Sequence, residues 1–265
     1  MRITRLLIGI VVTIALVGAA PQAGGADAPG AVETDPTATV GALYVPSVLG
    51  LGPIVGLPHE CTASVVHSTT HDLLLTAAHC VAGTGVGYEF APAYALGALP
   101  YGTWTVTRVY VNRAWAAHRD PQHDYAFLRV ARRSWHGATR AIEDVVGANA
   151  LGNAPSPGTS VTVIGYAAGS NDRPLSCTTA TYVQDGFPAF DCDGFVAGTS
   201  GSPWLSGAPG SATIHGVIGG LHGGGCTAAT SYSSAFGADI ANDLQRAENG
   251  GHGDLAPLVI GDDCS

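Results

Sequence analysis

The feature that most limits the fold of this chain is the alternation of short strand-like runs with turns rich in glycine and proline. The runs combine β-branched and aromatic residues, at 73–76, 104–111, 125–130, 160–166 and 214–218. The 37 glycines and 16 prolines supply the turns, because glycine permits positive φ and proline presets φ for a turn. Short strands between such turns predict an all-β barrel or sandwich.

Two segments depart from this pattern. Near the end of the chain, small and apolar residues recur at helical spacing, at Ile240, Ala241, Leu244 and Ala247. Gly250 and Gly251 stop this run, so we expect a C-terminal helix at about 238–248. Residues 133–158 contain a turn-rich stretch that is suited to join two lobes.

The N-terminus has the layout of a secretory signal peptide. Arg2 and Arg5 precede a 15-residue apolar run that ends in small residues at Ala19 and Ala20. This run is shorter than the roughly 20 residues of a membrane-spanning helix. We therefore expect a signal peptide over 1–28, cleaved between Ala20 and Ala28, and a protein that is secreted and free of the membrane. The alternative is an uncleaved membrane anchor.

Charge and cysteine content narrow the class further. The net charge is −9, which argues against nucleic acid as a partner. High hydrophobic content (46%) with few charges (12%) predicts a buried core and excludes disorder. The chain has six cysteines, at Cys61, Cys80, Cys177, Cys192, Cys226 and Cys264. Secretion permits three disulfides, in any of 15 connectivities. No CxxC pair occurs, so neither a metal nor a cofactor is expected.

Three short segments carry the residue types of a nucleophilic catalyst, in the order Thr76-Ala77-Ala78-His79-Cys80, His123-Asp124-Tyr125-Ala126 and Gly198-Thr199-Ser200-Gly201-Ser202-Pro203. A serine hydroxyl is a weak nucleophile, so it needs a base, and the base needs a partner that fixes its tautomer. Taken singly, His79 fits a core histidine, Asp124 a strand cap and Ser200 a simple loop. Together they predict a catalytic triad.

These segments resemble the trypsin-like (chymotrypsin-fold) serine endopeptidases, over roughly Val40 to Phe236. The resemblance implies two six-stranded antiparallel Greek-key β-barrels packed together, followed by the C-terminal α-helix. The expected parts are a signal peptide (1–28), a linker or short pro-segment (29–39), an N-terminal barrel with His79 and Asp124 (40–135), an interdomain connection (136–158), a C-terminal barrel with Ser200 and the helix (159–250) and a tail (251–265).

The resemblance also implies roles. Ser200 would be the nucleophile, His79 the general base and acid, and Asp124 the acid that orients it. The N–H groups of Gly198 and Ser200 would form the oxyanion hole. A bridge from Cys61 to Cys80 would staple the loop of the base to an earlier strand, and Cys177–Cys192 and Cys226–Cys264 are hypotheses for the remaining pairs.

One position departs from the vertebrate digestive members of the family. They carry an acid just before the nucleophile, which pairs with a freshly cleaved N-terminus, whereas this chain has Thr199. We therefore expect that activation switch to be absent. The Gly198–Pro203 segment is more similar to that of bacterial secreted relatives, including the glutamyl endopeptidases.

Substrate preference is less defined. Gly194 stands six residues before Ser200, where an acid would favour Lys or Arg, although Asp193 is adjacent. The predicted pocket residues are Gly194, Gly219, Gly220, Leu221 and His222. By the resemblance, the strand-like segment 217–222 would pair with the substrate backbone. His222 would receive an acidic side chain, or else is an exposed loop residue; His215 lies on the same segment.

The sequence therefore predicts a secreted endopeptidase that acts on proteins or peptides as a monomer. Two other functions are alternatives to it. One is a catalytically silent binding protein of the same fold. The other is an α/β-hydrolase, which requires the serine before the acid and the histidine, in a Gly-x-Ser-x-Gly elbow. The chain has the opposite order and no such elbow, because Ser202 stands where the last glycine is needed.

Overall fold

A computed structural model describes residues 28–46, 58–170, 172–259 and 264. The predicted signal peptide lies outside the described residues, apart from Ala28. In the part that the structure describes, no helix is both long and apolar enough to cross a membrane.

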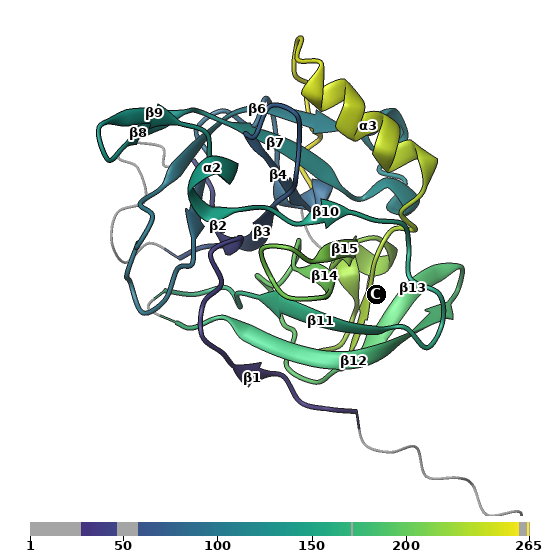
Figure 1. Cartoon of the computed structure of the whole chain (residues 1–265). Helices are drawn as coiled ribbons and strands as arrows, with labels where there is room; N and C mark the ends of the chain where they lie inside the picture. The colour runs from purple at the N-terminus through teal and green to yellow at the C-terminus, as the bar shows by residue number, and fades with distance from the viewer. Residues whose placement is uncertain (1–27, 47–57, 171, 260–263, 265) are drawn as a thin grey trace, which may run out of the picture.

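The first lobe is a closed antiparallel barrel of six strands in the order β2-β3-β4-β7-β6-β5 (Figure 1). Its strands are β2 (Val40–Tyr44), β3 (Cys61–Val65), β4 (Leu73–Thr76), β5 (Glu89–Pro92), β6 (Trp104–Val111) and β7 (Ala126–Val130). Side chains alternate across each strand. In β4, Leu74 therefore points into the barrel core, whereas Leu73 and Leu75 join a second core shared with Ile214 of the other lobe. Both faces of β4 are buried, and the strand fixes the lobes against each other.

The second lobe is an eight-stranded sheet, with the order β10-β15-β14-β11-β12-β13-β16 and β1 paired to β12. Its strands are β1 (Val32–Glu33), β10 (Ala150–Leu151), β11 (Ser160–Gly165), β12 (Leu175–Gln184), β13 (Phe187–Asp191), β14 (Pro203–Ser206), β15 (Thr213–Val217) and β16 (Thr230–Tyr232). The predicted all-β class is confirmed, with β11 to β16 as six consecutive strands of this lobe.

The second lobe differs in detail from the expected barrel. β1 and β10 are short additional strands, and β15 and β16 are not strand partners. The chain turns away after Val217, because Gly220 and Gly223 have φ of +79° and +61°. One hydrogen bond still joins the ends of β15 and β16. The N–H of Gly219, which follows β15, donates to the carbonyl of Tyr232 in β16 at 3.0 Å.

The segments predicted as linkers take part in the fold. Within 29–39, β1 runs beside β12, as Figure 1 shows, and the N–H of Ala31 donates to the carbonyl of Asp193 at 2.7 Å. The region between the lobes contains β8 (Arg133–Trp135), β9 (Ala138–Arg140), α2 (Glu143–Val146) and β10. β10 pairs in parallel with β15, so the connection is attached to the second lobe.

Helices are few. They are α1 (Arg113–His118), α2, α3 (Ala238–Glu248) and the 3-10 turns η1 (Ala78–Cys80), η2 (Pro121–His123) and η3 (Leu221–Gly224). The C-terminal helix is confirmed as α3, which follows the second lobe but packs on β6 and β7 of the first (Figure 1). Ile240 and Ala247 on its buried face join the core between the lobes.

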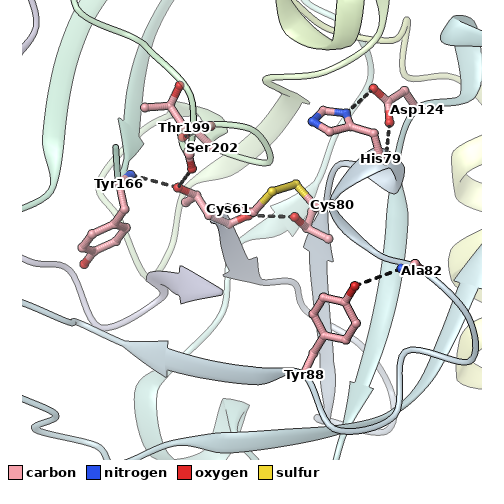
Figure 2. Close-up of a disulfide and its surroundings, with 12 residues drawn as sticks. Cys61, His79, Cys80, Ala82, Tyr88, Asp124, Tyr166, Thr199 and Ser202 are labelled. Atoms are coloured by element: carbon pink, nitrogen blue, oxygen red, sulfur yellow. Dashed lines mark hydrogen bonds and ion pairs between the residues drawn. A yellow bond between two sulfur atoms is a disulfide. The ribbon is translucent and has the colours of Figure 1, made fainter. Parts of the chain in front are cut away.

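All three expected disulfides are present, as Cys61–Cys80, Cys177–Cys192 and Cys226–Cys264. The first connects β3 to η1, the turn that carries His79 (Figure 2). Composition allowed 15 pairings, so the structure confirms a choice that counting alone leaves open.

Candidate active site

The predicted base lies directly after a buried strand. β4 ends at Thr76, the fully buried Ala77 and Ala78 follow, and His79 sits in η1 with its side chain 17% exposed. The small side chains let this turn pack against the barrel, and the Cys61–Cys80 bridge holds its far end. The imidazole is therefore held on a short, braced turn.

Asp124 is fully buried and accepts three N–H bonds. His79 donates from Nδ1 at 2.7 Å and from its backbone at 2.9 Å (Figure 2). The Gly220 N–H donates at 2.8 Å. These three donors fix the orientation of the carboxylate beside the imidazole. The bond to Nδ1 fixes the tautomer of His79, so Nε2 carries the free lone pair that a general base needs.

Opposing effects act on the protonation of His79. Burial lowers its pKa, while the charge of Asp124 and the hydrogen bond to it raise the pKa. The net effect is a pKa above the ordinary histidine value. The carboxylate thus stabilises an imidazolium in a site that is largely removed from water.

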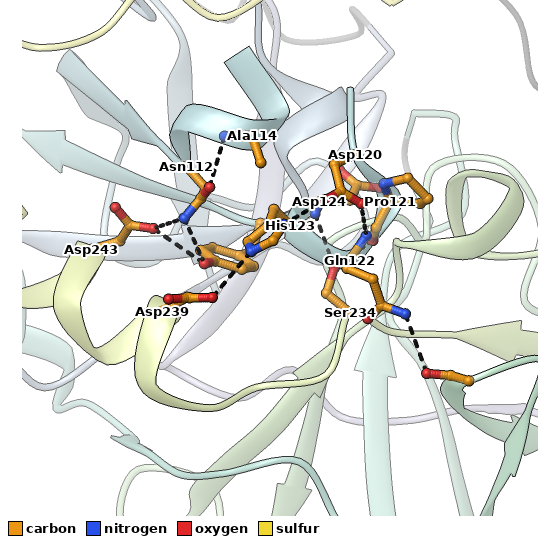
Figure 3. A network of polar contacts seen from close by, with 12 residues as sticks. Asn112, Ala114, Asp120, Pro121, Gln122, His123, Asp124, Ser234, Asp239 and Asp243 are labelled. Carbon is orange, nitrogen blue, oxygen red and sulfur yellow. Dashed lines mark hydrogen bonds and ion pairs between the residues drawn. The ribbon is translucent and has the colours of Figure 1, made fainter. Parts of the chain in front are cut away.

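The loop that carries Asp124 is tied to two other elements, as Figure 3 shows. The Asp124 N–H donates to Oγ of Ser234, next to β16, at 2.9 Å. His123 has Nδ1 3.0 Å from the carboxylate of Asp120 and Nε2 3.3 Å from that of Asp239 in α3. The acid of the candidate triad is therefore positioned by the second lobe and by the C-terminal helix.

The Ser200 loop offers two backbone donors. Among the described residues, the N–H groups of Gly198 and Ser200 donate to no acceptor, whereas that of Thr199 donates to the carbonyl of Val196 at 3.1 Å. The carbonyl of Ser200 is held by the N–H of Thr62 at 2.8 Å. The two unused N–H groups are the pair that the sequence predicts as an oxyanion hole, which requires preorganised donors.

Glycine is required on both sides of this loop. Gly198 and Gly201 have φ of +93° and +83°. A Cβ on Gly198 would stand 2.0 Å from the backbone nitrogen of Ala168, and one on Gly201 would stand 2.1 Å from the carbonyl oxygen of Thr62. Only glycine combines these backbone angles with such close packing.

His79, Asp124 and Ser200 all line one cleft of about 760 Å³. Apart from these three, the lining residues are Trp115, Arg119, Pro121, Phe195, Val196, Ala197, Thr199, Ile218, Gly220, His222, Gly223, Gly224, Gly225, Cys226, Thr227, Ala228, Ser231 and Val259. The structure thus brings the three predicted catalytic residues, from both lobes, to one solvent-accessible site. Neither Nε2 of His79 nor the Ser200 hydroxyl bonds to another described side chain.

A model of the trypsin-like peptidase domain matches residues 61–212, more than half of the chain. The chain belongs to the trypsin-like peptidases. The enzyme class predicted from the sequence, a serine-type endopeptidase, is thereby confirmed. Among curated proteins, none matches the chain.

Solved structures resemble this peptidase over most of its length. Protease Anisep from Arthrobacter nicotinovorans is 25% identical, with a TM-score of 0.67 over 82% of this chain and 99% of its own. The thermostable serine protease AL20 from an extremophilic microorganism is 20% identical, with a TM-score of 0.66 over 81% and 99% of the two chains. Human heparin binding protein, at 17% identity, has a TM-score of 0.59 over 86% and 100%. The last two show the shared fold alone.

The structure separates the predicted pocket residues of the peptidase. Gly220 and His222 line the cleft, but Gly194, Gly219 and Leu221 do not. Leu221 turns toward a small core around Phe187, because the chain bends at η3. Gly194 instead contacts a residue that lines the cleft, because its N–H donates to the carbonyl of Ala228 at 3.0 Å.

Several cleft residues of the peptidase escaped the sequence analysis. Phe195 and Ile218 supply an apolar wall, although neither is among the predicted pocket residues. Phe195 follows the predicted Gly194, and Ile218 lies within the segment 217–222. Trp115 of α1 and Val259 of the C-terminal tail come from distant parts of the chain. No local signal identifies such residues, since only the tertiary fold brings them to the cleft.

One cluster near the site has metal-ligand residue types. Cys61, His79 and Cys80 place ligand atoms within 4.8 Å of one another. The two sulfurs form a disulfide, so they do not provide the thiolates that a zinc site uses.

Proposed function

We propose that this peptidase hydrolyses peptide bonds through an acyl-enzyme on Ser200. His79 is the general base and acid, and Asp124 orients it. The observation that carries the proposal is the hydrogen bond between Nδ1 of His79 and Asp124, in the same cleft as Ser200. With Nδ1 held in this bond, Nε2 is left to take the proton of Ser200 in the proposed reaction.

The proposed reaction has two halves. Oγ of Ser200 attacks the peptide carbonyl carbon while Nε2 of His79 takes its proton, and the oxygen that becomes negative lies on the N–H groups of Gly198 and Ser200. The tetrahedral intermediate collapses as Nε2 gives its proton to the leaving amine. A water molecule then attacks the acyl-enzyme by the same route, which releases the acid and restores Ser200.

A phosphonate probe that reacts with activated serines tests this proposal. We expect an adduct on Ser200 of the folded parent protein, and neither adduct nor peptide hydrolysis in Ser200→Ala. Comparable turnover by parent and Ser200→Ala would contradict the assignment. A folded parent without an adduct would favour the catalytically silent alternative.

We also propose that the residue before the cleaved bond is not basic. Among the described residues that line the cleft, Asp124 is the one acid, and its oxygens already accept three N–H bonds. The remaining wall is apolar at Phe195 and Ile218 and offers His222 as a group that binds an acidic side chain.

Cleavage of a mixed peptide library, read by mass spectrometry, tests this preference. We expect cuts after apolar or acidic residues. If acidic residues are preferred, His222→Ala should lower cleavage after Glu and Asp and leave cleavage after apolar residues unchanged. Dominant cleavage after Lys or Arg would contradict the proposal.

Finally, we propose that the peptidase is secreted and acts as a monomer on proteins or peptides. The predicted signal peptide and the three disulfides support secretion, because disulfides persist in oxidising compartments. Recovery of the protein from the culture medium with a new N-terminus between residues 21 and 29 would confirm export. Retention of Met1 in a membrane fraction would support the anchor alternative.

A further inference from the structure

A second buried histidine–carboxylate pair lies away from the cleft. His59, just before β3, is fully buried, and its Nε2 is 2.9 and 3.1 Å from the two carboxylate oxygens of Asp172. The residues are 113 positions apart, on different lobes. Among the described residues, Nδ1 of His59 has no hydrogen-bond partner. The imidazole therefore makes its polar side-chain contact with Asp172 alone.

Aromatic rings surround the imidazole of this pair, whereas the side chain of Asp172 is 27% exposed. Tyr44, Tyr94 and Tyr166 meet the His59 ring edge to face, with centroids 5.8, 5.5 and 5.7 Å away. Burial raises the pKa of Tyr166, and the negative charge of Asp172 adds to this rise. A hydrogen bond from this buried imidazole to a carboxylate is stronger than one between two exposed groups. Removing one partner should therefore disturb the contact between the lobes.

The same histidine holds the loop that supports the oxyanion hole. The His59 N–H donates to the carbonyl of Gly169 at 2.9 Å, and the Gly169 N–H donates back at 3.4 Å. One residue earlier, the Ala168 N–H donates to the carbonyl of Ala197 at 2.7 Å. Ala168 also stands so close to Gly198 that a Cβ there would lie 2.0 Å from its nitrogen. The loop at 167–169 is thus the wall against which Gly198 is placed.

The side chain of Thr62 also connects Tyr166 to Gly198. Oγ1 of Thr62 accepts the N–H of Tyr166 at 2.9 Å and donates to the carbonyl of Gly198 at 3.3 Å. The His59 cage and the peptide of Gly198 are therefore joined through Tyr166 as well as through Ala168. Two connections, both through residues 166–169, lead from the His59–Asp172 pair to Gly198, a predicted oxyanion donor.

We propose that the His59–Asp172 pair positions the oxyanion loop, as an internal anchor present without cleavage of the chain; this inference rests on the proposed function of Ser200. Thr199 is consistent with it, since its side chain has no charge to pair with an N-terminus. Its hydroxyl is instead turned inward and donates to the carbonyl of Val196 at 2.7 Å. His59 and Asp172 are positioning residues, because neither lines the cleft.

Substitution of Asp172 tests the anchor. Asp172→Ala should lower kcat by about 10–100-fold with KM changed by less than about twofold, because a misplaced oxyanion donor affects the transition state more than substrate binding. Asp172→Asn keeps an acceptor for Nε2 and should recover part of the lost kcat. His59→Phe keeps a ring in the cage and should match Asp172→Ala, with no further loss in the double variant.

A matched control comes from an exposed pair of the same kind. His71 Nδ1 lies 2.7 Å from Asp144, on the surface and outside the cleft. Asp144→Ala should leave kcat unchanged. Unchanged kcat in folded Asp172→Ala, or a rise in KM alone, would overturn the anchor. If the alanine variant does not fold, a folded His59→Phe variant with parental kcat would overturn it equally.

The phosphonate probe separates this inference from the proposed function. A parent protein that forms no adduct on Ser200 means that the proposed function fails. A parent that reacts fully while Asp172→Ala reacts at the same rate means that only the anchor fails.

Discussion

Nδ1 of His79 lies 2.7 Å from Oδ2 of Asp124, although the two residues belong to different loops of the first barrel. The Gly220 N–H reaches the same oxygen from the second lobe at 2.8 Å. The acid is therefore held at the junction of the two lobes, and its geometry depends on how they pack. Even a small change to the Asp124 side chain should therefore lower kcat strongly.

Asp124→Asn should lower kcat by about 10⁴-fold, because an amide facing Nδ1 favours the wrong tautomer of His79. The fold should persist, since the side-chain shape is kept. Asp144→Asn is the control: this acid also contacts a histidine, His71, but lies outside the cleft, and its loss should change kcat by less than about threefold. Steady-state kinetics on one peptide checks both. Similar losses in the two variants would show that the tautomer is not the cause.

The activity of the free enzyme should rise with pH as His79 loses its proton. Because the pKa of His79 is raised, the acid limb of kcat/KM should have its midpoint above 6.5, the ordinary histidine value. Removing the negative charge in Asp124→Asn should move that midpoint to lower pH. A pH profile of parent and variant measures the shift. An unchanged midpoint would mean that Asp124 does not set the protonation of His79.

The raised pKa of His79 also makes the free energy of unfolding depend on pH. A pKa that is higher in the folded than in the unfolded state means that the folded protein binds the proton more tightly. The contribution of His79 is therefore fully present below the unfolded pKa and is lost as the pH rises through the folded pKa. Denaturant unfolding of parent and His79→Ala at several pH values should show a difference that shrinks toward alkaline pH.

Two glycines with nearly equal φ separate steric clash from backbone strain. Gly198 has φ +93° and a Cβ position 2.0 Å from the Ala168 nitrogen, whereas Gly207 has φ +92° and its nearest neighbour at 3.6 Å. Alanine at either position should cost about 1–2 kcal/mol of backbone strain. Only Gly198→Ala should also lower kcat, by about 100–1000-fold, because it displaces an oxyanion donor. Thermal unfolding and kinetics on both variants check this. Equal kcat in both would contradict the assigned role of Gly198.

The sequence predicted the parts of the site that depend on local pattern. The strands at 73–76 and 104–111 and the helix at 238–248 occur with the predicted bounds. Their patterns depend only on residues that are close together in the sequence. The pocket residues predicted on the segment 217–222 depend on how the chain bends after β15. Leu221 leaves the cleft because His222 and Gly223 have φ of +53° and +61°, a bend that spacing does not encode.

Contacts between distant segments that neither the cysteines nor the three motifs mark could not be predicted. Val259 reaches the cleft from the tail, and β1 pairs with β12 from a segment that composition describes only as a linker. The His59–Asp172 pair joins positions 113 residues apart. Such contacts depend on how the two lobes pack, which is a property of the whole core and of no single stretch.

The disulfides allow stability and catalysis to be tested separately. Cys61–Cys80 and Cys177–Cys192 have sequence separations of 19 and 15, so removing either pair by double alanine substitution should cost about 3 kcal/mol of unfolding free energy. Only the first bridge holds η1 and His79. We therefore expect kcat to fall in Cys61→Ala/Cys80→Ala and to stay near the parental value in Cys177→Ala/Cys192→Ala, at a temperature where both are folded. Equal kcat in the two variants would show that the strand and the core alone suffice to position the base.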